Sequence, residues 1–146
     1  MKSGLSDAAQ RCMVLAQVRA RRAGRGVVDT ADVALAVLVP FDGVLPVFAR
    51  SGFPQALELA CVAAIGSPGE FEGLLDTACL KGVQRVALAE AARRRSAHVE
   101  PEHLLAAAAR IEGPGRDLLL ACGVDYATLE RELGAIREHW MLDDET

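Results

Sequence analysis

Hydrophobic positions along the chain recur with a helical period, and the same pattern returns 71 positions later without a gap. Conservative pairs such as Cys12/Val83 and Val33/Leu104 lie between the identical ones. The identical pairs are Ala16/Ala87, Ala20/Ala91, Arg22/Arg93, Val28/Val99, Ala36/Ala107, Gly52/Gly123, Ala56/Ala127, Ala64/Ala135 and Ile65/Ile136. The duplication predicts two copies of one helical unit packed against each other. Such a scaffold suits recognition, because neither copy carries a set of reactive groups.

The first two helices of each copy have recognisable starts. The first helix is predicted to begin after Ser6, a suitable N-cap, and to end at Gly24, and its counterpart spans about residues 77–95. The second helix opens at residues 29–32 in the first copy and at residues 100–102 in the second, where Pro101 suits the first helical position. The apolar runs that follow these starts predict the buried centre of each unit. They are residues 33–39 and 104–109.

Two shorter helices complete each predicted copy. Loops at residues 41–43 and 112–115 precede third helices at 44–50 and 116–121, and fourth helices follow at 54–65 and 125–138. We therefore expect an all-α fold of two tandem, pseudo-symmetric four-helix repeats that form one compact eight-helix domain. Its predicted boundaries are 1–66 for the first repeat, 67–73 for the linker, 74–139 for the second repeat and 140–146 for the tail.

Composition and charge narrow the function classes. The 146 residues are 51% hydrophobic but only 4% aromatic, which favours close-packed helices over a sheet sandwich. No apolar run approaches the roughly 18 to 20 residues of a membrane helix, and no signal peptide opens the chain, so we expect a soluble cytoplasmic protein without a membrane partner. The net charge of −4 argues against nucleic acid as a partner. Two arginine clusters, at residues 19–25 and 93–95, are interpreted as cations that complement helix C-termini.

The reactive side chains form no recognisable catalytic or metal set. Cys12, Cys61, Cys79 and Cys122 contain no C-x-x-C pair and are predicted to be free, buried thiols. The histidines, at positions 98, 103 and 139, lie near no useful set of ligands. No nucleophile with an adjacent base is visible. We therefore predict no enzyme activity, no catalytic residue, no metal and no cofactor.

Short motifs recur in the same order in both copies. The first copy contains Leu5-Ser6, Ala16-x-x-x-Ala20-x-x-x-Gly24, Asp29-Thr30-Ala31-Asp32-Val33 and Phe48-x-x-x-Gly52-Phe53. The second contains Ala87-x-x-x-Ala91, Val99-Glu100-Pro101-Glu102-His103-Leu104-Leu105 and Leu119-x-x-x-Gly123-Val124-Asp125. In this order, over residues 4–138, they resemble the Clp N-terminal repeat domain of the ClpA-, ClpB- and ClpC-type AAA+ unfoldases.

This resemblance implies a non-catalytic module that recognises substrates, adaptors or regulators of a Clp-type ATP-dependent protease or chaperone. It does not imply ATPase activity, because a phosphate loop requires G-x-x-x-x-G-K-[ST] and the only lysines are Lys2 and Lys81. The chain is then either the N-domain of a longer Clp ATPase or a stand-alone relative. The acidic tail, with no long linker after it, favours the stand-alone form.

Some ClpC-type members bind phosphoarginine through a glutamate in a G-T-E-H motif of each repeat. Here the first copy keeps the threonine as Thr30 but has Ala31 at the glutamate position, and the second keeps Glu102 but has Pro101 at the threonine position. Each site therefore keeps half of the pair, and for Glu102 the alternative is a solvated acid in the first turn. By analogy, the expected partner-binding surface lies at the second-helix starts. Its residues are Thr30, Asp32, Glu102 and His103.

Actinobacterial ClpC N-domains also bind cyclic peptide antibiotics, at the positions of the repeats' leading phenylalanines. Those positions are Leu5 and Asp76 here, so Leu5 keeps a possible hydrophobic ligand patch whereas Asp76 replaces an anchor with a charge. An alternative function is therefore a stand-alone decoy or self-protection protein that sequesters Clp-targeting cyclic peptides.

Overall fold

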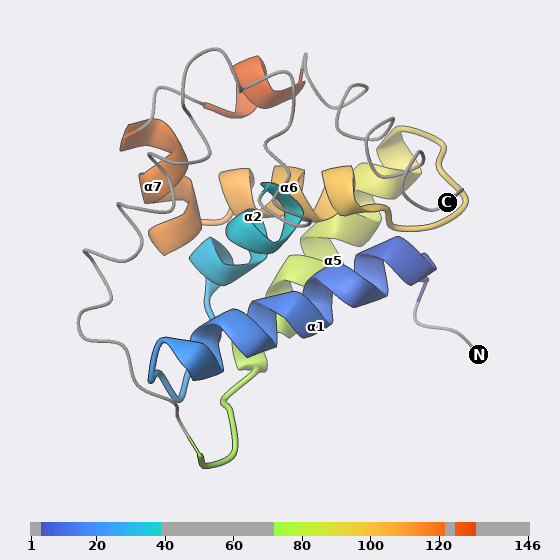
Figure 1. The fold of residues 1–146 in the computed structure, drawn as a ribbon. Helices are drawn as coiled ribbons and strands as arrows, with labels where there is room; N and C mark the ends of the chain where they lie inside the picture. The colour runs from blue at the N-terminus through green and yellow to red at the C-terminus, as the bar shows by residue number, and fades with distance from the viewer. Residues whose placement is uncertain (1–3, 39–71, 122–124, 131–146) are drawn as a thin grey trace.

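The computed structural model describes residues 4–38, 72–121 and 125–130, and in these residues the chain is all-helical, with no strand. The helices are α1 (Asp7–Arg22), α2 (Thr30–Leu38), α5 (Ala78–Arg93), α6 (Pro101–Arg110) and α7 (Pro114–Ala121), followed by a helical segment at residues 126–130 (Figure 1). This confirms the all-α class. The predicted third and fourth helices of the first copy lie outside the described residues, as do Cys61, Cys122, His139 and the tail.

Helix α1 begins and ends where the sequence predicts. Ser6 has extended backbone angles, and its hydroxyl accepts a hydrogen bond from the Ala9 N–H at 3.1 Å. At the other end Gly24 takes a φ of 76°, and the Arg25 N–H returns to the Ala20 carbonyl at 3.0 Å. A left-handed residue of this kind satisfies carbonyls that the helix leaves open, and it favours glycine.

Helix α5 ends with the same backbone geometry 71 residues later. The Ser96 N–H donates to the Ala91 carbonyl at 2.8 Å, and the left-handed position is taken by Arg95, with a φ of 58°. An L-residue with a side chain adopts this conformation at a cost that glycine avoids. The duplication therefore extends to the backbone of the helix ends, while the residue at the strained position differs.

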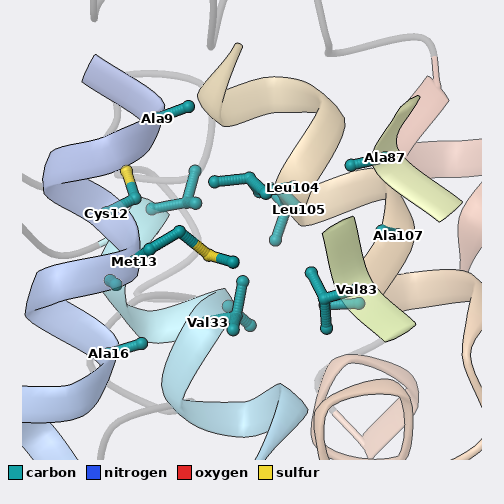
Figure 2. Packing of buried hydrophobic residues seen from close by; sticks show 14 of the residues in the cluster. Ala9, Cys12, Met13, Ala16, Val33, Val83, Ala87, Leu104, Leu105 and Ala107 are labelled. Atoms are coloured by element: carbon teal, nitrogen blue, oxygen red, sulfur yellow. The ribbon is translucent and has the colours of Figure 1, made fainter. Parts of the chain in front are cut away.

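The core lies where the second helices of the two copies meet. Helix α1 packs on α2, α5 packs on α6, and α2 and α6 contact each other. The described residues of α2 from 30 to 37 and of α6 from 101 to 109 are all buried, which confirms the predicted buried centre. The alanine-rich face of α1 lies opposite Val33 and Leu104 (Figure 2), and these small side chains let the helices approach closely.

Two short backbone bridges hold the copies together reciprocally. Leu5, just before α1, pairs with Val99, just before α6. In turn Val27, just before α2, pairs with Asp76, just before α5. The Val99 N–H donates to Gly4 and the Asp76 N–H to Gly26, each at 2.7 Å. Each copy thus lends the segment before its first helix to the other copy.

The third helix of the second copy begins earlier than the sequence predicts. We expected a loop over residues 112–115, but α7 begins at Pro114. Proline suits a first helical turn, because its missing N–H would have no partner there. Gly115 in that turn touches α2 so closely that an added Cβ would lie 2.7 Å from the backbone carbon and oxygen of Thr30.

Candidate functional site

Two aspartates cap the start of α2. The Asp29 side chain accepts hydrogen bonds from the N–H groups of Ala31 at 2.9 Å and Asp32 at 3.3 Å. The Asp32 carboxylate in turn accepts from the Asp29 N–H at 3.0 Å. This reciprocal arrangement satisfies donors that a helix start leaves open. It confirms residues 29–32 as the start of the second helix.

Arg25 joins these two carboxylates. Its guanidinium lies 3.2 Å from Asp29 Oδ2 and is also hydrogen-bonded to Asp32 Oδ1. Burial opposes ionisation of Asp32 and raises the pKa of its carboxyl above the ordinary value, although the hydrogen bond from Arg25 acts in the other direction. The nearby charge of Asp29 also favours the neutral form of Asp32.

Thr30 connects α2 to α7 rather than to solvent. Its hydroxyl oxygen accepts the Gly115 N–H at 2.7 Å in a buried environment. This N–H belongs to the first turn of α7, where no helical carbonyl is available to it. Thr30 therefore acts as a buried cap for a helix of the other copy.

The start of α6 uses a different pair of side chains at the equivalent positions. The Glu100 N–H donates to Nδ1 of His103 at 2.9 Å, and Pro101 occupies the first turn as predicted. His103 thus takes the place that Asp32 holds in α2. An imidazole accepting at Nδ1 performs the same capping task as a carboxylate oxygen.

The predicted partner-binding residues divide between two helix starts and are all buried. Their exposed fractions are 2% for Thr30, 1% for Asp32, 3% for Glu102 and 2% for His103. This burial does not match the expectation of an open contact surface at these side chains, nor the alternative of a solvated acid at Glu102. Leu5 is 9% exposed and belongs to the core, so its side chain does not form a surface patch.

A second charged cluster, which the sequence analysis did not identify, surrounds Glu90 at the end of α5. Glu90 is fully buried, and its carboxylate accepts from Arg110 Nη1 at 2.7 Å, Arg93 Nη2 at 3.1 Å and the Tyr126 hydroxyl at 2.9 Å. Arg94 Nε lies 3.4 Å from the same carboxylate. Arg93 and Arg94 also contact Glu130, and Arg93 donates to the Tyr126 hydroxyl.

These donors decide the charge of Glu90. Burial alone opposes ionisation, but the hydrogen bonds from Arg110, Tyr126 and Arg93 outweigh it, so the pKa of Glu90 lies below its ordinary value. The arginines at residues 93 and 94 therefore do more than complement a helix dipole. The sequence signal was present, because Glu90 interrupts the buried stripe formed by Leu80, Val83, Ala87 and Ala91.

Apart from these polar clusters, the outer face of α1 carries a surface hollow of about 650 Å³. Asp7, Gln10, Arg11, Val14 and Leu15 line it. Val14 is 58% exposed and offers an apolar contact on this face. The hollow lies one turn from Leu5, whose carbonyl accepts from the Gln10 side chain at 3.3 Å.

The remaining reactive groups show no site of their own in the part of the chain that the structure describes. Cys12 and Cys79 are free thiols, and burial raises the pKa of both. Over residues 4–38, 72–121 and 125–130, no group of histidine, cysteine and acidic side chains is arranged to hold a metal ion. Within those same ranges, no helix has the length and apolar character needed to cross a membrane.

Comparisons with known proteins show what this sequence and fold are similar to. Residues 77–143 match the family model described as the Clp repeat (R) N-terminal domain, and no curated protein sequence matches the chain. A solved structure from a study of a malarial protein secretion system has a TM-score of 0.72 at 14% identity, over 90% of this chain and 92% of that one. The N-terminal domain of the caseinolytic protease associated chaperone ClpD from Arabidopsis thaliana has a TM-score of 0.61 at 17% identity, over 91% and 94%. Residues 77–143 are therefore similar to the Clp repeat N-terminal domain family, and the fold is similar to that of the ClpD N-terminal domain.

Proposed function

We propose that the chain is a non-catalytic protein-binding module that recognises substrates, adaptors or regulators of a Clp-type ATP-dependent protease or chaperone. The Clp repeat match over residues 77–143 carries this proposal. We further infer two tandem four-helix repeats, with boundaries 1–66 and 74–139, joined by a linker at 67–73 and followed by a tail at 140–146. The 71-residue duplication and the matching ends of α1 and α5 support that division.

The outer face of α1 is the surface that best suits such recognition. Its hollow of about 650 Å³ combines the apolar side chains of Val14 and Leu15 with the polar Gln10 and Arg11. Apolar contacts supply binding energy and the polar rim supplies specificity. The buried residues Thr30, Asp32, Glu102 and His103 contribute indirectly in this proposal, because they fix the starts of α2 and α6.

Affinity capture from lysate of the source organism tests this function. We expect tagged wild-type chain to enrich a Clp-type ATPase, one of its adaptors or its degradation substrates, identified by mass spectrometry. Val14→Asp should lose these proteins, because it places a charge in the apolar part of the hollow. Leu74→Asp is the matched control, since Leu74 is 96% exposed and lies outside that hollow. Failure of the wild-type chain to enrich any Clp component would contradict the proposal.

A sequestering role for Clp-targeting cyclic peptides is the second candidate function. The observation that favours it is that the α1 hollow lies one turn from Leu5. Leu5 occupies the position at which the peptide-binding Clp N-domains carry a leading phenylalanine. A thermal shift assay with such a peptide tests it directly. We expect the peptide to raise the Tm of the wild-type chain and of Leu74→Asp but not of Val14→Asp. An unchanged wild-type Tm at saturating peptide would exclude the role.

A further inference from the structure

Arg110 is held in place by a buried anchor while half of its side chain faces solvent. Its Nη1 donates to Glu90 Oε2 at 2.7 Å, and its guanidinium carbon lies 5.3 Å from the centre of the Tyr126 ring. The side chain remains 50% exposed. Among the described residues, none accepts a hydrogen bond from Nε or Nη2 of Arg110. The guanidinium therefore presents two fixed donor groups outward.

Arg110 lines two surface hollows. One, of about 380 Å³, is lined by Arg110 and Arg116 together with Leu120, Tyr126, Ala109 and Asp125. The other, of about 320 Å³, is lined by Arg110 and Arg85 together with Val86, Ala89 and Ile111. Arg110 thus stands between two hollows, each of which has a second arginine and an apolar part.

The flanking arginines are available for an external partner. Neither Arg85 nor Arg116 forms an ion pair with any residue in the described ranges. Among the described residues, the one acid that lines either hollow is Asp125, and its carboxylate accepts the Thr128 N–H at 2.7 Å as a helix cap. Three guanidinium groups from α5, α6 and α7 therefore face a shared surface on a chain whose net charge is −4.

We propose that this surface, defined by Arg85, Arg110 and Arg116, binds an acidic peptide segment with interspersed apolar side chains. The proposal names a class of ligand for the protein-binding module and rests on the proposed function. Carboxylates at intervals along the segment pair with the three guanidinium groups, which form paired hydrogen bonds to a carboxylate. Apolar side chains of the segment fill the two hollows beside Leu120 and Ile111. The apolar linings of both hollows favour a peptide over a nucleic acid, whose anionic backbone carries no apolar side chains to fill them.

Fluorescence anisotropy with the complete chain tests this binding. The probe is a labelled 12-residue peptide of alternating Glu and Leu, and its control replaces every Glu with Gln. Arg85→Gln and Arg116→Gln each remove one guanidinium that has no described ion pair, so both variants should fold normally. Arg110→Lys keeps the charge opposite Glu90 but removes the planar fork. Arg22→Gln is the matched control, because it removes an exposed arginine at the end of α1.

We expect the Glu-containing peptide to bind, and the Gln peptide to bind at least tenfold more weakly. Loss of one charge-assisted contact should weaken binding about tenfold in Arg85→Gln, Arg116→Gln and Arg110→Lys, with no change in Arg22→Gln. Equal binding of both peptides, or equal affinity of all variants, would overturn the proposal. So would displacement of the peptide by single-stranded DNA or by anionic vesicles at lower concentration, since either would assign the surface to another partner.

Peptide binding and capture from lysate together distinguish failure of the acidic-peptide surface from failure of the proposed function. If wild-type chain enriches Clp components from lysate but the Glu-containing peptide does not bind it, or binds all the arginine variants equally, the acidic-peptide surface is wrong and the protein-binding module stands. If the acidic peptide binds through these arginines but no Clp component is captured, the surface stands and its assignment to Clp-dependent proteolysis is wrong.

Discussion

Asp32 and Glu90 are both buried carboxylates, and they differ in the direction of their pKa shift. Asp32, at the start of α2, has one guanidinium and one backbone N–H as donors and the acidic Asp29 beside it, and burial prevails, so its pKa is raised. Glu90, at the end of α5, receives hydrogen bonds from two arginines and a tyrosine, and its pKa is lowered. The comparison shows that burial alone does not determine ionisation. The number of donors decides which form the fold favours.

The two carboxylates do not occupy equivalent positions of the duplication. The second-repeat counterpart of Asp32 is His103, and the first-repeat counterpart of Glu90 is the partly exposed Arg19. The backbone hydrogen bonds at the helix ends are nevertheless the same in both repeats. The duplicated backbone thus tolerates different side-chain chemistry at its buried polar positions.

The largest effect is expected from Glu90→Gln. The substitution leaves Arg93, Arg94 and Arg110 around a neutral amide that accepts fewer hydrogen bonds than the carboxylate. We expect the free energy of unfolding to fall by about 3 kcal/mol, as for removal of one partner from a buried ion pair. Urea denaturation followed by circular dichroism measures it. Glu130→Gln, whose side chain is 38% exposed, should cost less than about 1 kcal/mol; an equal loss in both variants would contradict the special role of Glu90.

The ends of α1 and α5 should respond to substitution with opposite signs. Gly24→Ala places a Cβ at a φ of 76° and should cost about 1 to 2 kcal/mol. Arg95→Gly relieves a side chain at a φ of 58° and should gain about 0.5 to 1 kcal/mol, part of the relief being offset by a more flexible unfolded chain. Thermal unfolding of the two single variants and the double variant measures both changes in stability. A loss of stability in Arg95→Gly would show that its side chain stabilises the helix end.

The helix starts differ in their dependence on the N-cap hydroxyl. Ser6→Ala removes the acceptor for the Ala9 N–H and should cost about 1 kcal/mol. Thr77→Ala should change stability by less than half of that amount, because the Thr77 side chain makes no capping hydrogen bond. Urea midpoints of the two variants give the comparison, and a greater loss in Thr77→Ala would contradict it.

Asp32→Asn is expected to act chiefly through the pH dependence of stability. Because the folded-state pKa of Asp32 is raised, its contribution to stability is full below the ordinary value of 3.8 and is lost as pH rises through the higher folded pKa. Asp32→Asn should remove that slope, because the amide does not ionise, while its oxygen can still accept the Asp29 N–H.

Glu90 should show the opposite pH dependence. Its contribution to stability is full above the ordinary value of 4.5 and is lost as pH falls through the lower folded pKa. Unfolding free energies of the wild-type chain, Asp32→Asn and Glu90→Gln from pH 3 to 7 measure both slopes. If the unfolding free energy depended on pH in the same way in both variants, the opposite pH dependences expected for Asp32 and Glu90 would be contradicted.

Interactions between residues close in the sequence predicted most helix boundaries of the described residues. Ser6 as N-cap, Gly24 as helix end, Pro101 in a first turn and the apolar runs of α2 and α6 all follow from interactions within a few residues, and the structure confirms them. The start of α7 was predicted two residues too late. The residues 113–115 combine two glycines with a proline, a composition that is typical of a loop and of a helix start alike.

The candidate site was harder to predict, because its geometry depends on contacts distant in the sequence. Thr30 meets Gly115 across 85 positions, and Glu90 meets Tyr126 across 36. Neither separation has a sequence signature. The family analogy drew attention to the helix starts, but it carried over an exposure that the buried side chains of Glu102 and His103 do not have.

The reciprocal bridges between Leu5 and Val99 and between Val27 and Asp76 have a consequence for how such a domain is assembled. A single repeat, expressed alone, would expose the backbone donors and acceptors of both its leading segment and its inter-helix loop. A second identical chain would satisfy all of them at once through a two-fold exchange. The tandem chain thus has the connectivity of a fused homodimer, and its halves should unfold together in one cooperative transition rather than as separate units.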